Sequence, residues 1–195
     1  MKNKKISAIF ISAAAAVLVS GCVKVVPIGQ ESMYTGEVAF DSGAESSSDW
    51  SKVVEEISGA ATDLAGLLGG DGIGSTGAAV SGTASVVEFN TDTPKYYLLI
   101  TLDGYSGDEE IRIQAGGVYS GTAIRDLQSV KNFEDFTNQT EWSQYGKALN
   151  SEADAQVVAP LALDDSAAGK TVTFTGVATV SGDVVTITPV ALSIE

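Results

Sequence analysis

The order of the expected secondary-structure elements constrains the fold of this chain most strongly. Residues 84–89, 95–102 and 109–114 are rich in Val, Ile, Leu, Tyr and Phe and are bounded by Gly, Pro and Asp, a pattern that predicts three strands. Helical spacing of apolar residues then predicts a helix at 133–150. Two further strands, at 171–180 and 184–194, are joined by Ser181-Gly182-Asp183, which predicts a hairpin.

Three strands, a helix and two strands, in that order, are typical of an OB-fold, a small and partly open five-stranded barrel. The segment Gly169-Lys-Thr-Val-Thr-Phe-Thr-Gly176 before the last hairpin favours the same architecture. We therefore expect a mainly β chain with helical additions, of the α+β class. An antiparallel sheet with helices on one face has the same element order, so both folds stay open at this point.

An amphipathic helix precedes the expected barrel. Trp50, Val53, Ile57, Leu64 and Leu68 fall on one helical face, Ser48 or Asp49 is suited to the N-cap, and glycines at 69–70 end the pattern. We interpret residues 41–49 as a solvated loop and expect the apolar face to pack on the barrel, with a partner-binding face as the alternative. Residues 69–82 form a glycine-rich loop without the lysine of a phosphate-binding loop, which argues against nucleotide binding there.

The first 21 residues have the pattern of a secretory signal peptide. Residues 1–5 are basic, and residues 6–19 are apolar but too short to span a bilayer. The following Val19-Ser20-Gly21-Cys22 resembles a bacterial lipobox, which implies cleavage before Cys22 and lipidation of that residue; an ordinary signal peptide with an incidental cysteine is the alternative. Cys22 is the only cysteine, so an intrachain disulfide is impossible.

These features predict a signal peptide at 1–21, a tether at 22–47 and a single domain at 48–195. The protein is expected in the cell envelope, lipid-anchored outside the cytoplasm, on either the periplasmic face or the cell surface. The inner or outer membrane is left open.

The charge and the residue types exclude several functions. Without the three lysines of the leader, 8 basic residues stand against 25 acidic ones, a formal charge of −17. This charge argues against a nucleic-acid partner, because such partners require basic residues. The chain has no histidine, and its cysteine is assigned to lipidation. We therefore expect no catalytic residues, no metal site, no cofactor and no enzymatic activity.

Six polar or aromatic residues in the connection between the third and fourth barrel strands are candidates for ligand binding: Thr122, Arg125, Asp126, Asn138, Gln139 and Trp142. In one interpretation they form a structural network, with Arg125 paired to an acidic residue such as Asp135 and the amides bonded to backbone groups. In the other, they face a cavity floored by Trp142, Phe136 or Tyr119 and bind the hydroxyls and ring face of a sugar or polyol.

The same connection resembles a family of predicted periplasmic lipoproteins, the domain of unknown function 2291. The matching residues are Gly116, Val118, Gly121, Thr122, Ala123, Arg125, Asp126, Phe133, Asp135, Phe136, Asn138, Gln139, Ala148, Leu149 and Asn150. The likeness extends to the region of Trp50, to Gly169-Lys170 and to the segment 187–190. Gly117 departs from the family's proline, Ile124 from its leucine, and Tyr119-Ser120 from its usual pair of an apolar and a basic residue.

The family has no established activity, but its genes often lie beside those of sugar ABC importers. The resemblance therefore implies an accessory role in carbohydrate uptake, with importer components as partners. We expect a lipid-anchored, ligand-binding or transporter-accessory module, with protein–protein interaction or a structural envelope role as the alternative.

Overall fold

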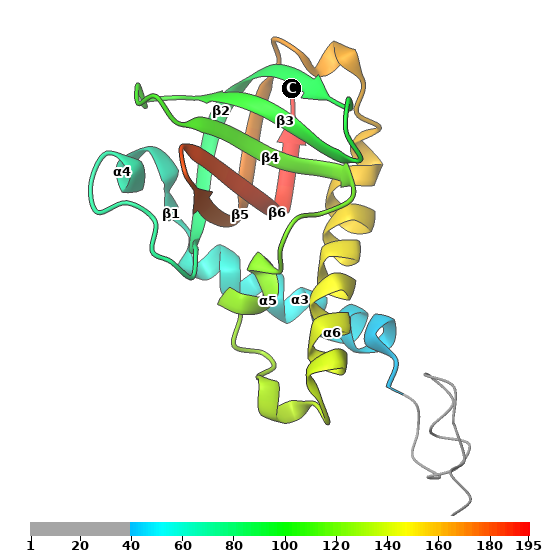
Figure 1. The fold of residues 1–195 in the computed structure, drawn as a ribbon. Helices are drawn as coiled ribbons and strands as arrows, with labels where there is room; N and C mark the ends of the chain where they lie inside the picture. The colour runs from blue at the N-terminus through cyan, green and yellow to red at the C-terminus, as the bar shows by residue number, and fades with distance from the viewer. Residues whose placement is uncertain (1–39) are drawn as a thin grey trace, which may run out of the picture. The chain divides into compact units, whose positions relative to one another are not determined.

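The computed structural model describes residues 40–195, and the predicted signal peptide, Cys22 and most of the predicted tether lie outside the described residues. Five strands form a barrel: β2 (Ala78–Asn90), β3 (Lys95–Leu102), β4 (Glu110–Gly117), β5 (Thr171–Ser181) and β6 (Val184–Ile194). They follow the order β2-β3-β4-β6-β5, and β2 also pairs with β5, which closes the sheet on itself (Figure 1). The β4–β6 pair is parallel and the other pairs of the barrel are antiparallel. The predicted barrel is confirmed, and the open sheet is excluded because β2 and β5 pair.

Alternating side chains of the strands fill the barrel. Leu98, Ile100 and Leu102 of β3 point inward, as do Ile113 of β4 and Ile187 of β6, and all are buried. Because successive residues of a strand face opposite sides, the residues between them lie on the outer surface. That outer surface carries the site described below.

The strand boundaries agree with the prediction to within one residue except at β2 and β4. The prediction that β2 begins at residue 84 was wrong, because the strand begins at Ala78 and its first six residues pair with β5 from Ala178 to Thr173. This glycine- and alanine-rich stretch has little strand propensity, and pairing with β5 overrides it. Gly82 is required there, since a Cβ would lie 2.8 Å from the ring of Phe174. Strand β4 continues three residues beyond the expected end.

Helix α3 (Ser42–Ala60) is displaced from its predicted position. Its N-cap is Asp41, whose carboxylate accepts hydrogen bonds from Gly43 N and Ala44 N, both at 3.0 Å, so the interpretation of residues 41–49 as a loop was wrong. The chain then becomes extended in β1 (Thr62–Asp63), which pairs with β2, before the short helix α4 (Leu64–Leu68). The spacing of apolar residues therefore predicted one helix where the structure has two, α3 and α4.

The apolar face of α3 is part of the core. Trp50, Val53 and Ile57 are buried, and α3 packs against α6 (Gln139–Ala153) and against β2 and β5. Figure 1 shows α3 crossing below the barrel while α6 runs along its side. Core packing was the first of the two predicted roles for this face, and burial removes the alternative of a partner-binding face.

The predicted helix at 133–150 is two elements. A 3-10 turn at Phe133–Asp135 comes first, and α6 begins only at Gln139. The short helix α5 (Ala123–Leu127) was not predicted. After α6 the chain passes through a π-helical turn, Asp154–Val158, and 3-10 turns at Ala159–Leu161 and Asp165–Ala167 before β5. Among residues 40–195, no helix combines the length and hydropathy needed to cross a bilayer.

Candidate functional site

A groove of about 510 Å³ lies on the outer surface of the barrel, over β3, β4 and β6. The register brings outward residues of all three strands to its floor, since Tyr97 of β3 pairs with Gln114 of β4 and Arg112 of β4 pairs with Thr186 of β6. Ten residues line the groove: Thr93, Pro94, Lys95, Tyr96, Tyr97, Arg112, Gln114, Val118, Ser120 and Thr186.

Two loops form the walls of the groove and are joined to each other. The loop between β2 and β3 supplies Pro94, whose carbonyl oxygen accepts a hydrogen bond from Val118 N at 2.7 Å. Val118 belongs to the turn that follows β4. Gly117 makes this approach possible, because it adopts a φ of +66° and a Cβ there would overlap the Pro94 carbonyl oxygen.

Gln114 fixes the same turn from the floor of the groove. Its side chain is buried, its Nε2 donates to Thr188 Oγ1 at 2.7 Å, and its Oε1 accepts from Ser120 N at 2.5 Å. The amide therefore satisfies its own buried groups and ties the turn to the barrel. Sequence reasoning missed Gln114, although a polar residue between Ile113 and Ala-Gly-Gly is a signal that points to it.

Arg112 is held in one orientation on the floor of the groove. Its guanidinium carbon lies 4.4 Å from the centre of the Tyr97 ring, and its Nε donates to a carboxylate oxygen of Glu110. That hydrogen bond raises the pKa of Arg112 above its usual value. Lys95 is exposed at the edge of the groove. Among residues 40–195, no group accepts a hydrogen bond from its Nζ or forms an ion pair with it.

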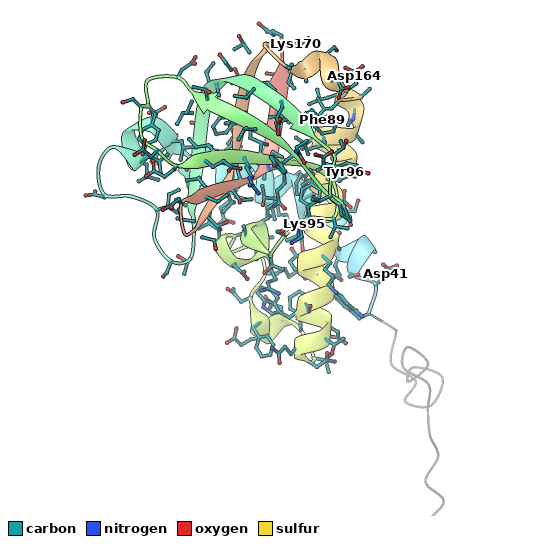
Figure 2. All side chains as sticks on the ribbon, turned by 45° about the horizontal axis from the view of Figure 1, so that its top comes forward. Asp41, Phe89, Lys95, Tyr96, Asp164 and Lys170 are labelled. Atoms are coloured by element: carbon teal, nitrogen blue, oxygen red, sulfur yellow. The ribbon has the colours of Figure 1, made fainter. Side chains whose placement is uncertain are left out.

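An exposed aromatic residue also lines the groove. Tyr96 is 37% exposed and contacts Phe89 edge-on, with ring centres 6.3 Å apart. Figure 2 shows Lys95, Tyr96 and Phe89 near the same end of the β2–β3 hairpin. A shallower hollow of about 410 Å³ lies at Phe89 and Thr91 and is bounded by residues 164–166.

The residues predicted from sequence form a separate cluster, and none of the six lines the groove. Arg125 Nη2 donates to Asp126 Oδ1 at 2.5 Å and to Thr122 Oγ1 at 2.9 Å, and Thr122 Oγ1 donates to Asp126 Oδ2 at 2.7 Å. The guanidinium also lies 4.7 Å from the ring of Trp142. The partner of Arg125 is thus Asp126 and not Asp135, whose carboxylate accepts instead from Asn132 N at 2.7 Å.

The two predicted amides lie at the start of α6. Asn138 is the N-cap, since its Oδ1 accepts from Glu141 N at 3.0 Å, and its carbonyl accepts from Trp142 N at 3.2 Å. Gln139 is exposed. Trp142 packs among other aromatic rings, with ring centres 5.2 Å from Phe136 and 6.1 Å from Tyr145. The structure therefore brings Thr122, Arg125, Asp126 and Trp142 together as a network that satisfies its own polar groups.

Tyr119, the third candidate for a cavity floor, points toward α6. Its hydroxyl donates to Asp154 Oδ1 at 3.4 Å, and burial together with the nearby carboxylate raises the pKa of Tyr119. In the connection between β4 and β5, where the sequence predicted the ligand-binding residues, only Val118 and Ser120 line the groove.

The groove offers hydroxyls, an ammonium, a guanidinium and aromatic rings, and none of its ten lining residues is acidic. Within residues 40–195, no three side chains of the types that bind metals lie close enough together to hold an ion. These groups are suited to holding a small polar molecule by hydrogen bonds and ring contacts.

Comparisons with known proteins agree with the fold. The chain is similar to an OB-fold protein from Thermotoga maritima MSB8 whose crystal structure is known, with a TM-score of 0.63 and 18% identity over 81% of this chain and all of that one. At this identity the likeness concerns the fold alone. No curated protein matches the chain significantly.

A family model described as "Predicted periplasmic lipoprotein (DUF2291)" matches residues 72–193. The match includes the turn after β4, α5, α6 and the last hairpin, but it does not reach the Trp50 region that the resemblance also suggested. A family of predicted periplasmic lipoproteins agrees with a lipid-anchored position in the cell envelope. Because the match spans more than half of the chain, this protein belongs to the DUF2291 family of predicted periplasmic lipoproteins.

Proposed function

We propose that this protein is a non-enzymatic, lipid-anchored binding module of the cell envelope that holds a small polar ligand, such as a sugar, in the groove over β3, β4 and β6. The groove carries the proposal, because it joins exposed Tyr96 to the cations Lys95 and Arg112 on a rigid floor. A ligand there would displace no protein contact of the Arg125 cluster.

The position of the groove supports this proposal. OB-folds bind ligands on the face of their second and third strands, between the loop that joins the first two strands and the loop that joins the last two. In this chain the second and third barrel strands are β3 and β4, and the first of those loops contains Thr93 and Pro94. Oligonucleotides are disfavoured, since residues 40–195 contain 7 basic and 23 acidic residues.

A role in carbohydrate uptake is compatible with this groove. Aromatic faces and hydroxyl or amide groups are the contacts that sugar rings and sugar hydroxyls require, and Tyr96, Ser120 and Thr186 supply them at the groove surface. We propose that the protein presents such a ligand to a sugar importer, the role that the family resemblance implies.

A thermal-shift screen of the full-length protein in detergent against common sugars and polyols tests the proposal. A ligand at 100 times its dissociation constant would add about 2.7 kcal/mol to the unfolding free energy. At this chain length we expect a rise in Tm of about 5–10 °C. Arg112→Gln is expected to abolish the shift, whereas Arg125→Gln, in the neighbouring cluster, is expected to lower the Tm of the free protein and leave the shift in place. The absence of a shift with every compound would refute the proposal.

Protein–protein interaction is the second candidate, and one exposed ring favours it. Phe133, in the connection before α6, is 48% exposed and contacts Trp142 edge-on with ring centres 6.4 Å apart. Exposed aromatic side chains often anchor interfaces. If this function is correct, the wild-type protein will capture importer components in a pull-down and a Phe133→Ser variant will not, while Arg112→Gln will capture them normally.

A further inference from the structure

We propose that the natural ligand of the groove carries a carboxylate, and that it is a small sugar acid rather than a neutral sugar. This inference rests on the proposed function and names its ligand class. It follows from where the few positive charges of the protein lie. Residues 40–195 contain only seven basic side chains against 23 acidic ones, yet Lys95 and Arg112 both line the groove, and no acidic residue does.

Arg112 is prepared to bind an anion. Glu110 engages Nε and the Tyr97 ring covers the face of the guanidinium, so the side chain is already fixed before any ligand arrives. Its Nη1 and Nη2 atoms have no hydrogen-bond partner among residues 40–195. The two nitrogens form a planar fork of donors that matches the two oxygens of a carboxylate.

Lys95 supplies the second charge at the groove edge. Together with Arg112 and its partner Glu110, it leaves the floor and edge of the groove with a net charge of +1. That charge balances one carboxylate and leaves a doubly charged phosphate monoester only half neutralised. The local charge therefore favours a monoanion.

The rest of the groove is suited to a hydroxylated body. The hydroxyls of Ser120 and Thr186 have no hydrogen-bond partner among the described residues, and the exposed ring of Tyr96 provides an apolar face. An aliphatic acid would leave these hydroxyls unmatched, whereas a sugar acid offers both ring hydroxyls and a carboxylate. The volume of about 510 Å³ lies within the range of small-molecule sites.

Calorimetric titration of the full-length protein in detergent with three probes tests the inference: galacturonate, neutral galactose, and propionate, which has the carboxylate without the hydroxyls. We expect galacturonate to bind at least about tenfold more tightly than either other probe, the effect of one hydrogen bond to a charged group. Its affinity should also fall as salt is raised, because the cations are partly exposed.

The variants Lys95→Gln and Arg112→Gln should each weaken galacturonate binding by about tenfold or more. Arg112→Lys should recover only part of the loss, since it restores the charge but not the fork of donors. Lys147→Gln, which removes an equal charge from an exposed site on α6, is the matched control and should bind as the wild type does. Urea unfolding of each variant establishes that it is folded.

The inference is overturned if galactose or propionate binds as tightly as galacturonate, or if Lys95→Gln and Arg112→Gln bind galacturonate normally. Binding of galactose alone would overturn the inference and leave the proposed function standing. If none of the three probes binds, the inference fails, and the proposed function fails with it only when the wider screen of sugars and polyols is also negative.

Discussion

Replacing Gly117 by alanine should damage both the stability of the protein and its groove, and Gly121 provides a matched control. Gly117 ends β4 and Gly121 lies in the turn after it, and both have a left-handed φ, +66° and +71°. They differ in their surroundings, since a Cβ at Gly117 would overlap the carbonyl oxygen of Pro94, whereas a Cβ at Gly121 would meet nothing within 4 Å.

The expected losses follow from this difference. Alanine in the left-handed region costs about 1–2 kcal/mol, and Gly121→Ala should lose no more than that. Gly117→Ala must also move the backbone away from Pro94. That movement breaks the 2.7 Å hydrogen bond from Val118 N, worth about 1 kcal/mol, and adds about 1–3 kcal/mol of crowding. We therefore expect Gly117→Ala to lose about 3–6 kcal/mol.

Urea unfolding followed by fluorescence or circular dichroism measures both variants. The expected gap of about 2–4 kcal/mol between them corresponds to a difference of about 1–2 M in the urea midpoint. In addition, Gly117→Ala should bind ligand more weakly than Gly121→Ala, because only the former separates the two walls of the groove. Equal midpoints for the two variants would refute the argument that the contact with Pro94 requires glycine.

Three further predictions concern other parts of the molecule. Burial and the carboxylate of Asp49 raise the pKa of Tyr145 above its usual value of 10.0, so the unfolded chain loses the hydroxyl proton first as the pH rises. The unfolding free energy should therefore fall above about pH 10, by up to about 1.4 kcal/mol per pH unit. Urea unfolding between about pH 9 and 11 should show a shallower fall for Tyr145→Phe than for the wild type, and an unchanged slope would contradict this. Tyr97→Phe should keep the affinity of the groove for its ligand, whereas Tyr97→Leu should lower it several-fold, because an aromatic ring is needed to hold the guanidinium of Arg112. Calorimetric titration of both variants measures the two affinities, and equal values would contradict this prediction. Cys22→Ser should leave the protein unlipidated and outside the detergent phase in a phase-separation assay, and its retention there would refute the predicted lipidation.

The fold was predictable because its strands carry the signal themselves. The bounds of β3 and β6 matched the predicted ones, since alternating apolar residues and clear turns define them. The first half of β2 was not predictable, because its small residues become a strand only through pairing with β5. The start of α3 was also missed: Asp41 is a good N-cap, but four serines and two acidic residues follow it within residues 42–49 and resemble a loop.

The groove could not be found from sequence because its parts lie far apart in the chain. Arg112 and Tyr97 lie on the neighbouring strands β4 and β3. Thr186 of β6 lies next to Arg112 only because β6 pairs in parallel with β4. Single-strand patterns mark these residues merely as outward-facing. The polar cluster around Arg125 was visible because its members are close in sequence, and that same closeness lets them satisfy one another.

The predicted cluster and the groove are nonetheless connected through one turn. Gln114 holds the turn between them at Ser120 N, and Asn150 of α6 holds the adjacent residue by donating from Nδ2 to Gly121 O at 2.9 Å. Thr122, where Arg125 and Asp126 converge, is the next residue. The polar residues around α5 and α6 thus contact the side of this turn that faces away from the groove. They fix the turn in place, and its residues Val118 and Ser120 form a wall of the groove. Residues of this stretch therefore position one wall of the groove, while Tyr97, Arg112 and Thr186 on its floor come from the strands.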